Sequence, residues 1–281
     1  MSLWEAIVLG IVQGLTEFLP ISSTAHLLVV RQFMGHPDPR DAFTTVIQMG
    51  TLVAVFLYLR ADIVRLVKAF LGDVRAMKFG TSTESLLCWK IVAGTVPVVV
   101  CGLAFKHFIK GTLYGLPVIA VAAIVFALLL LAAELLANRR KKAGDVGRGE
   151  ETITWQDALL IGAFQALALI PGASRSGVTI TAGLFAGLSR PAAARFSFLL
   201  SLPSMLGAGL KEMYDDKDKL FASGDEVMHL VVGAAAAGVV GYAAISWLLG
   251  YLKKHSTYGF IVYRIVLGVT LAGLLVAKVL K

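Results

Sequence analysis

The chain has 281 residues, of which 57% are hydrophobic and 16% are charged, and its formal net charge is +8. The apolar share is higher and the charged share lower than in typical soluble domains, and the mean hydropathy is +0.79, so the composition excludes a water-soluble fold. The positive charge does not indicate nucleic-acid binding, because the basic residues cluster between apolar runs, as the positive-inside rule expects of a membrane protein.

In chain order, the first element is an apolar stretch, Leu3 to Val30, and its first ten residues lack the basic region of a cleaved signal peptide. It is broken in the middle by Pro20-Ile-Ser-Ser-Thr-Ala-His26. A second broken stretch, Trp155 to Leu188, is interrupted by Pro171-Gly-Ala-Ser-Arg-Ser-Gly177. The unbroken runs are long enough, or nearly so, to cross roughly 30 Å of hydrocarbon. We predict that they form six transmembrane helices, at Phe43 to Leu59, Leu86 to Phe105, Leu116 to Ala137, Phe196 to Leu210, Val227 to Leu252 and Phe260 to Leu280.

The broken stretches do not have the pattern of plain spans. Backbone that is not helical at membrane depth is tolerated only where it is buried in protein or lines a wet cavity. We therefore expect two re-entrant helix-loop-helix hairpins, each of which enters the membrane and returns to the same side. The predicted fold class is an all-α polytopic membrane protein with a single integral membrane domain, 1–281.

The two broken stretches also resemble each other. Leu9-Gly-Ile-Val-Gln-Gly-Leu15 matches Ile161-Gly-Ala-Phe-Gln-Ala-Leu167, and each precedes a Pro and a Ser cluster. These matches predict an internal repeat, with halves at about 1–137 and 155–281 joined by a basic loop, 138–154. If both broken stretches are hairpins, the basic segments at 60–84 and 138–154 share the cytoplasmic face, and both termini lie outside. The repeat then has inverted topology, and its two broken tips meet near the midplane.

The first tip carries a carboxylate, hydroxyls and an imidazole. Gln13 and Glu17 are four residues apart and share one helix face. An ionisable residue inside an apolar span is usually functional. Glu17 either holds a divalent cation together with Gln13 or orients His26. The structural alternative is that Glu17 only caps the following turn or pairs with Arg175. His26 is a candidate base or nucleophile beside Ser22, Ser23 and Thr24, although these three residues also suit helix N-caps.

The second tip has the residue types of a phosphate site. Gly172 and Gly177 let backbone N–H groups approach an anion closely, and a following helix would point its positive end at it. Arg175 supplies a planar fork for phosphate oxygens. Hydroxyl donors accompany it at Ser174, Ser176 and Thr179. A structural arginine that only ties the two hairpins together is the alternative.

The two tips together resemble the motifs of the bacterial undecaprenyl-diphosphate phosphatase family, also called the bacitracin-resistance proteins. The matching segments are Gln13-xxx-Glu17 with Phe18-Leu-Pro-Ile-Ser-Ser-Thr-Ala-His26, and Pro171-Gly-Ala-Ser-Arg-Ser-Gly177. The resemblance covers the whole chain and includes Val46-Ile-Gln48-Met-Gly50. It implies a multi-pass protein of the bacterial cell (inner) membrane that hydrolyses undecaprenyl pyrophosphate to the monophosphate and phosphate. That activity recycles the lipid carrier for peptidoglycan synthesis and confers bacitracin resistance.

The resemblance also implies a site opening to the outer face and a Mg²⁺ or Ca²⁺ cofactor. It assigns catalysis to Ser23, His26, Glu17 and Arg175, and metal binding to Glu17 and Gln13. Gln13 occupies the first acid position of the family motif, a variant that the motif permits, so charge neutralisation of the metal falls mainly on Glu17. The expected substrate-phosphate ligands are Ser22, Thr24, Gly172, Ser174, Arg175, Ser176 and Thr179.

Our sequence-based hypothesis is attack on phosphorus by Ser23 with His26 as base. Attack by His26 or by a metal-bound water remains an alternative. The expected partners are a polyprenyl pyrophosphate lipid and membrane lipid, with no nucleic acid, and a homodimer is one open arrangement. The rival function is a secondary transporter or flippase of a lipid-linked phosphate, because inverted repeats with broken helices are typical of transporters.

Overall fold

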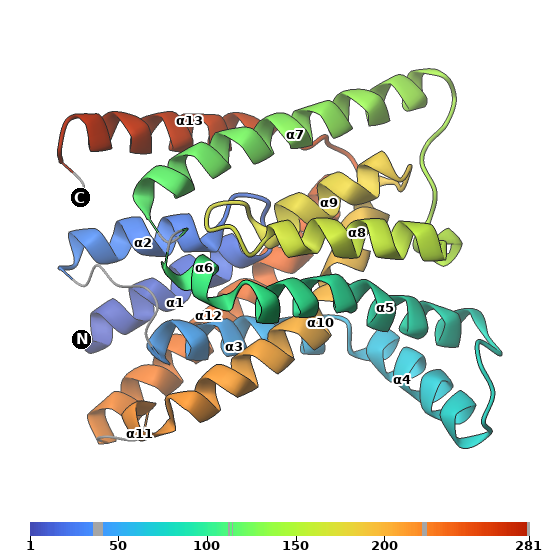
Figure 1. Cartoon of the computed structure of the whole chain (residues 1–281), viewed down its shortest axis with the longest axis horizontal. Helices are drawn as coiled ribbons and strands as arrows, with labels where there is room; N and C mark the ends of the chain where they lie inside the picture. Colours follow the sequence, from blue (N-terminus) through green and yellow to red (C-terminus); the bar gives the residue numbers. More distant parts are fainter. Residues whose placement is uncertain (36–41, 112, 114, 221–223, 280–281) are drawn as a thin grey trace.

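The computed structural model describes residues 1–35, 42–111, 113, 115–220 and 224–279, and its regular structure there is helical apart from one β-bridge between Arg148 and Leu188 (Figure 1). The helices are α1 (Leu3–Glu17), α2 (Ser23–Phe33), α3 (Ala42–Tyr58), α4 (Arg60–Arg75), α5 (Thr83–Ala104), α6 (Lys106–Gly111), α7 (Leu116–Lys142), the short 3-10 helix η1 (Glu150–Thr152), α8 (Trp155–Leu167), α9 (Arg175–Phe185), α10 (Arg190–Asp215), α11 (Lys217–Leu220), α12 (Gly224–Leu252) and α13 (Tyr258–Val276).

The apolar runs form long helices, as predicted. Within the described residues, five helices are long and apolar enough to cross a bilayer, namely α5, α7, α10, α12 and α13. Helix α3 becomes a sixth span if it is counted together with α4, from which it is bent by 80°. The prediction of a polytopic helical membrane protein is therefore confirmed, with five to six spans.

Two predicted loops are wrong in part. The basic segment after the first predicted span is mostly helix α4, because its apolar and charged residues alternate at helical spacing and form an amphipathic helix. Helix α7 continues through four basic residues to Lys142, so the basic loop predicted at 138–154 begins only at Ala143. Basic side chains at a helix C-terminus favour this extension. The predicted end of the last span, Leu280, lies outside the described residues.

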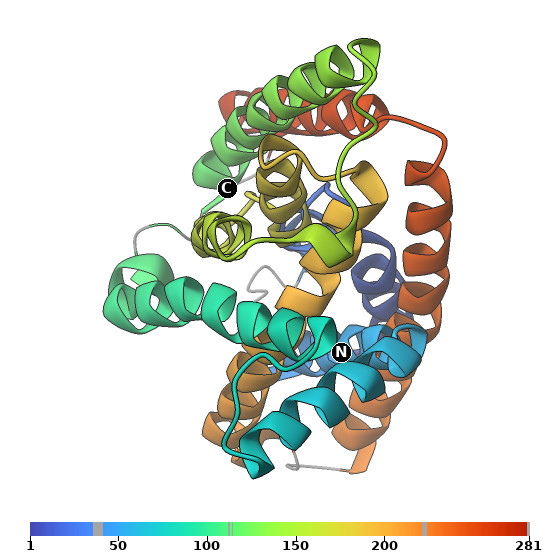
Figure 2. The same ribbon diagram turned by 90° about the vertical axis from the view of Figure 1, so that its right-hand side faces the viewer.

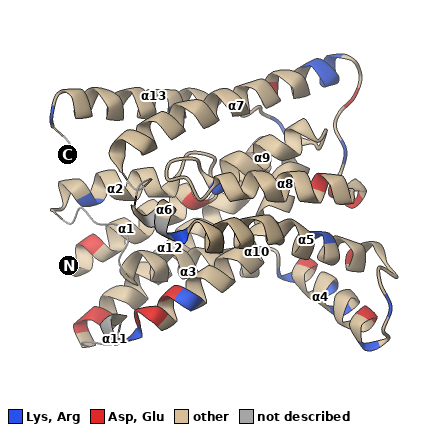
Figure 3. Ribbon diagram, in the orientation of Figure 1, with Lys and Arg blue, Asp and Glu red and all other residues tan. Residues whose placement is uncertain are grey.

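The helices run broadly between two ends of the molecule, where charged residues gather (Figures 1 and 3). The N-terminus and the end of α13 lie at one end. Helix α1 begins and helix α2 ends at that same end, whereas α8 begins and α9 ends at the opposite one. Viewed along the bundle, α7 and α13 pair on one side, and α5 and α12 lie on opposite flanks (Figure 2). The breaks between α1 and α2 and between α8 and α9 therefore fall inside the bundle.

Equivalent glycines allow close contact between each first helix of a broken pair and its neighbour. Helix α1 packs on α12 and helix α8 packs on α5. A Cβ atom at Gly10 would lie 2.3 Å from the carbonyl oxygen of Gly233, and one at Gly162 would lie 2.1 Å from that of Gly94. Small residues at such crossings let backbones approach in a membrane, where packing drives helix association.

Replacing Gly162 by alanine is expected to destabilise the protein by about 1–3 kcal/mol, because the added methyl group overlaps the backbone of α5. Thermal unfolding in detergent measures this effect. The matched control is Gly207→Ala in α10, where a Cβ meets nothing within 4 Å, so its unfolding temperature should stay level or rise. Equal unfolding temperatures for the two variants would contradict the close crossing.

Candidate active site

The two helices that follow the breaks start in the same way. Helix α2 is capped by Ser22 with φ 74° and helix α9 by Ser174 with φ 68°. The side chain of each serine accepts a hydrogen bond from a backbone N–H three residues on, at Ala25 and Gly177. A positive φ is uncommon for serine, and strained backbone of this kind gathers at functional sites. Both breaks thus direct a helix N-terminus into the bundle.

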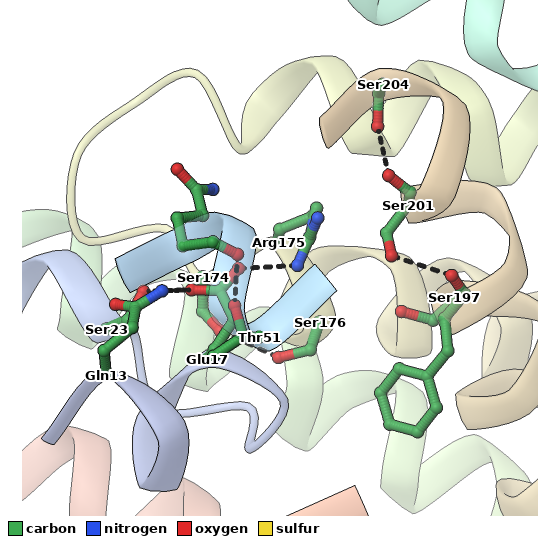
Figure 4. A network of polar contacts seen from close by, with 12 residues as sticks. Gln13, Glu17, Ser23, Thr51, Ser174, Arg175, Ser176, Ser197, Ser201 and Ser204 are labelled. Carbon is green, nitrogen blue, oxygen red and sulfur yellow. Dashed lines mark hydrogen bonds and ion pairs between the residues drawn. The ribbon is translucent and has the colours of Figure 1, made fainter. Parts of the chain in front are cut away.

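Glu17 joins the two breaks through three hydrogen bonds (Figure 4). The Nη2 atom of Arg175 donates to Oε1 of Glu17 over 2.6 Å. The Oγ atom of Ser23 donates to Oε2 over 2.7 Å, and Nε2 of Gln13 donates to the same oxygen over 3.0 Å. The side chains of Glu17 and Arg175 are only 6% and 15% exposed. The predicted meeting of the two tips is therefore present, and it is a buried ion pair with a serine hydroxyl attached.

A cavity of about 220 Å³ lies beside this ion pair. The Nη1 atom of Arg175 is buried and has no hydrogen-bond partner among the described protein groups. A buried donor without a partner is costly, so a guanidinium group in this position is suited to receive an anion. The residues lining the cavity come from both broken pairs and from α3, α5 and α10: Glu17, Ser22, Ser23, Thr24, Gln48, Val98, Gln165, Ala168, Leu169, Ile170, Gly172, Ser174, Arg175, Ser204, Met205 and Ala208.

Most of the predicted site residues line the cavity, but four do not. Gln13 contacts Glu17 through the hydrogen bond from its Nε2 atom but does not line the cavity itself. The Oγ atom of Ser176 donates to the carbonyl oxygen of Leu19 over 2.9 Å, which ties the second tip to the first. The Oγ1 atom of Thr179 donates to the carbonyl oxygen of Arg175 and also bonds the hydroxyl of Ser197. In this structure the hydroxyls of Ser176 and Thr179 hold the tips in shape, and their phosphate contacts stay predictions.

His26, the fourth, is not hydrogen-bonded to Ser23. Its Nδ1 atom lies 2.7 Å from the carbonyl oxygen of Ser22, and its Nε2 atom lies 2.6 Å from the hydroxyl of Tyr263. The carbonyl only accepts, so Nδ1 carries the proton and Nε2 accepts from Tyr263. The group that accepts the hydrogen bond from Ser23 Oγ is Glu17, and the catalytic role of His26 stays a prediction.

Arg264 contacts both tips that carry the site, and the sequence did not reveal these partners. Its fully buried guanidinium donates to the carbonyl oxygens of Gly172 at 3.1 Å and Ala173 at 2.9 Å. Longer contacts of 3.5 Å reach the carbonyl oxygens of Pro20 and Ala122. One side chain from α13 thus ties both tips to α7. The available signal was a charged residue inside an apolar span, which is rarely without function.

The cavity offers few ligands to a metal ion. Within the described residues there is no group of three His, Cys, Asp or Glu side chains suited to one. Glu17 is the one carboxylate among the residues lining the cavity, and its oxygens already accept from Arg175, Ser23 and Gln13. Mg²⁺ is commonly held by one or two carboxylates together with substrate phosphates. The residues therefore fit a divalent cation only when phosphate oxygens complete its ligands.

The fold and the site together define a polytopic membrane protein with a polar cavity and a buried ion pair at the junction of two broken helix pairs. The family model described as "Bacitracin resistance protein BacA" matches residues 6–270, and the chain belongs to this family.

Curated relatives match along almost the whole chain. An undecaprenyl-diphosphatase of Chlorobium phaeobacteroides (strain BS1) is 52% identical over 275 residues, with 98% of each chain covered. The undecaprenyl-diphosphatase of Chlorobium chlorochromatii (strain CaD3) has the same identity and coverage. That of Chloroherpeton thalassium (strain ATCC 35110 / GB-78) is 51% identical over 276 residues, covering 98% of this chain and 97% of its own.

Proposed function

We propose that this protein is a membrane phosphatase that hydrolyses undecaprenyl diphosphate to undecaprenyl phosphate and phosphate. The observation that carries the proposal is the Ser23–Glu17–Arg175 cluster, which lines a cavity inside an apolar helical bundle. A hydroxyl that is hydrogen-bonded to a carboxylate supplies a nucleophile and its base. An arginine whose Nη1 atom has no protein partner supplies a hydrogen-bond donor for phosphate oxygens. The names of relatives that are about half identical along the whole chain agree with this activity.

The topology that we propose is an inverted repeat with two re-entrant hairpins, α1–α2 and α8–α9, in halves of about 1–137 and 155–281. Matching details support it. Helices α1 and α8 both start with a capping box, formed by Ser2 with Glu5 and by Thr154 with Asp157. The sequence separation between the caps of α1 and α8 equals that between the caps of α2 and α9, Ser22 and Ser174. Each hairpin also starts and ends at one end of the bundle (Figure 1).

The orientation that we propose has both termini outside the cell. The end opposite the termini carries the four basic residues in the last turn of α7, and basic ends of spans face the cytoplasm. Val98 and Ala208 line the cavity from the later parts of α5 and α10, toward the end with the termini. The cavity then opens to the outer face, where it meets a lipid whose diphosphate lies at the membrane surface.

The proposed reaction begins when Ser23 Oγ attacks the terminal phosphorus and Glu17 Oε2 takes the hydroxyl proton. A P–O bond forms to serine, the bridging P–O bond breaks, and undecaprenyl phosphate leaves with its electron pair. Water then attacks the phosphoserine, the P–O bond to serine breaks, Glu17 returns its proton to Ser23 Oγ, and phosphate is released. The free Nη1 of Arg175 and the N-termini of α2 and α9 stabilise the charge that develops on the phosphoryl oxygens.

A divalent cation, Mg²⁺ or Ca²⁺, is part of the proposal. Glu17 would hold it, and phosphate oxygens of the substrate would complete its ligands. Gln13, the other predicted metal residue, would orient the Glu17 carboxylate through the hydrogen bond from its Nε2 atom. When bound, it would neutralise negative charge on the diphosphate.

The purified protein is expected to release phosphate from undecaprenyl diphosphate in detergent, and EDTA should reduce the rate at least about 100-fold, because Arg175, which already pairs with Glu17, cannot neutralise the diphosphate charge without the cation. Adding excess Mg²⁺ or Ca²⁺ should restore it. Full activity in EDTA would contradict the cation, but not the phosphatase. Absence of release from well-folded protein would overturn the phosphatase and favour a lipid-phosphate transporter, the alternative suggested by the repeat.

A further inference from the structure

Gln165 on α8 has a polar side chain with no assigned task. It is 1% exposed, and neither its Nε2 nor its Oε1 atom has a hydrogen-bond partner among the described protein groups. It nevertheless lines the same cavity as Ser23 and Arg175. Buried amides normally find partners, and each exception needs an explanation such as a ligand. A ligand in the cavity could supply the missing hydrogen-bond partner of this amide.

The repeat explains why Gln165 lacks a protein partner. Its counterpart in the first pair is Gln13, whose Nε2 donates to Glu17, four residues further along the helix. The residue four positions after Gln165 is Leu169, which also lines the cavity but carries no acceptor. The second broken pair therefore keeps the glutamine and lacks the carboxylate. This difference leaves the Gln165 amide without the carboxylate partner that Gln13 has.

The charges around the cavity favour an anionic partner for this amide. The charged side chains that line it are Glu17 and Arg175, which pair with each other. A neutral amide donor adds a phosphate contact without adding a charge, and its oxygen can accept from a phosphate hydroxyl or a water molecule. Arg175 reaches the cavity from α9 and Gln165 from α8, so the two residues approach a bound headgroup from different helices.

We propose that Gln165 is a binding residue for the diphosphate headgroup, to which Nε2 donates a hydrogen bond. The inference rests on the proposed phosphatase function. In this arrangement Glu17 and Ser23 act on the terminal phosphorus, while Gln165 contributes to holding the substrate in both the ground state and the transition state. Its loss should therefore weaken binding more than chemistry.

The test compares wild-type protein with Gln165→Leu, Gln165→Glu and the control Gln156→Leu, which alters an exposed glutamine on the same helix. Gln165→Leu should raise KM for undecaprenyl diphosphate roughly tenfold with kcat changed less than about twofold, as expected for a lost hydrogen bond to a charged group. Gln165→Glu should raise KM further, because a carboxylate repels the diphosphate. Gln156→Leu should leave both constants unchanged.

Stability without substrate separates binding from a structural role. Gln165→Leu removes a buried amide that has no partner, so its unfolding temperature should equal or exceed that of wild type. A lowered unfolding temperature, or an unchanged KM, would overturn the proposal. Binding of undecaprenyl diphosphate to Ser23→Ala, with and without Gln165→Leu, gives an answer without turnover. Wild-type protein that binds this lipid but does not cleave it would overturn the phosphatase, while the affinities still test Gln165.

Discussion

Replacing Glu17 by glutamine is expected to reduce the rate of phosphate release by roughly 1,000-fold, within the range for loss of a general base. Glutamine keeps the size of the side chain but removes the charge that accepts from Ser23 and pairs with Arg175. Initial rates with undecaprenyl diphosphate measure the effect. A decrease in kcat rather than an increase in KM is expected, because proton transfer belongs to the chemical step.

The same substitution leaves the buried Arg175 without its counter-charge, so stability should fall by about 3 kcal/mol. Phosphate should then raise the unfolding temperature of Glu17→Gln more than that of wild type, because the free guanidinium seeks an anion. Glu151→Gln, an exposed carboxylate before α8, is the control and should match wild type. Near-normal kcat in Glu17→Gln would contradict its role as the base and return attention to His26.

Replacing Arg264 by methionine is expected to lower activity at least about 100-fold, because both tips lose the side chain that holds them in register. Methionine fills similar space but donates no hydrogen bond, so the carbonyl oxygens of Gly172 and Ala173 lose their buried partner. Stability should fall by about 2–5 kcal/mol. Rates of phosphate release and thermal unfolding measure the two effects.

Two further variants test whether Arg264 acts by holding the two tips in position through its guanidinium hydrogen bonds. Arg264→Lys keeps the charge but offers three donors from one nitrogen atom, so it should recover stability more fully than activity. Val266→Met, at an exposed position on α13, should behave like wild type. If Arg264→Met folds and works normally, the carbonyl contacts do not hold the tips.

The sequence predicted the spans well because membrane insertion depends on local composition. The run predicted at Leu86 to Phe105 is α5, Thr83–Ala104, and the run predicted at Val227 to Leu252 is α12, Gly224–Leu252. The breaks were equally visible, since Pro, Gly and Ser interrupt apolar runs at both tips. Helix α4 was missed because its charges were interpreted only as a cytoplasmic loop, although the same residues form an amphipathic helix.

The sequence predicted which residues form the site but not which of them are hydrogen-bonded to one another. The sequence brought Glu17, Ser23 and Arg175 into one site, yet it assigned His26 as the base for Ser23. The structure gives that position to Glu17 and pairs His26 with Tyr263, which is 237 residues away. Residue spacing on one helix cannot reveal which face of a turn meets a distant helix.

By itself, the sequence determined that this is a polytopic helical membrane protein with two apolar stretches interrupted by polar motifs, because hydropathy and helix-breaking residues act over a few neighbouring positions. Only the tertiary structure decided that Arg175 reaches Glu17, that Arg264 holds both tips, and that Gln165 faces the cavity without a partner. These contacts join segments more than 90 residues apart, and they form only when packing brings the two broken pairs together inside the bundle.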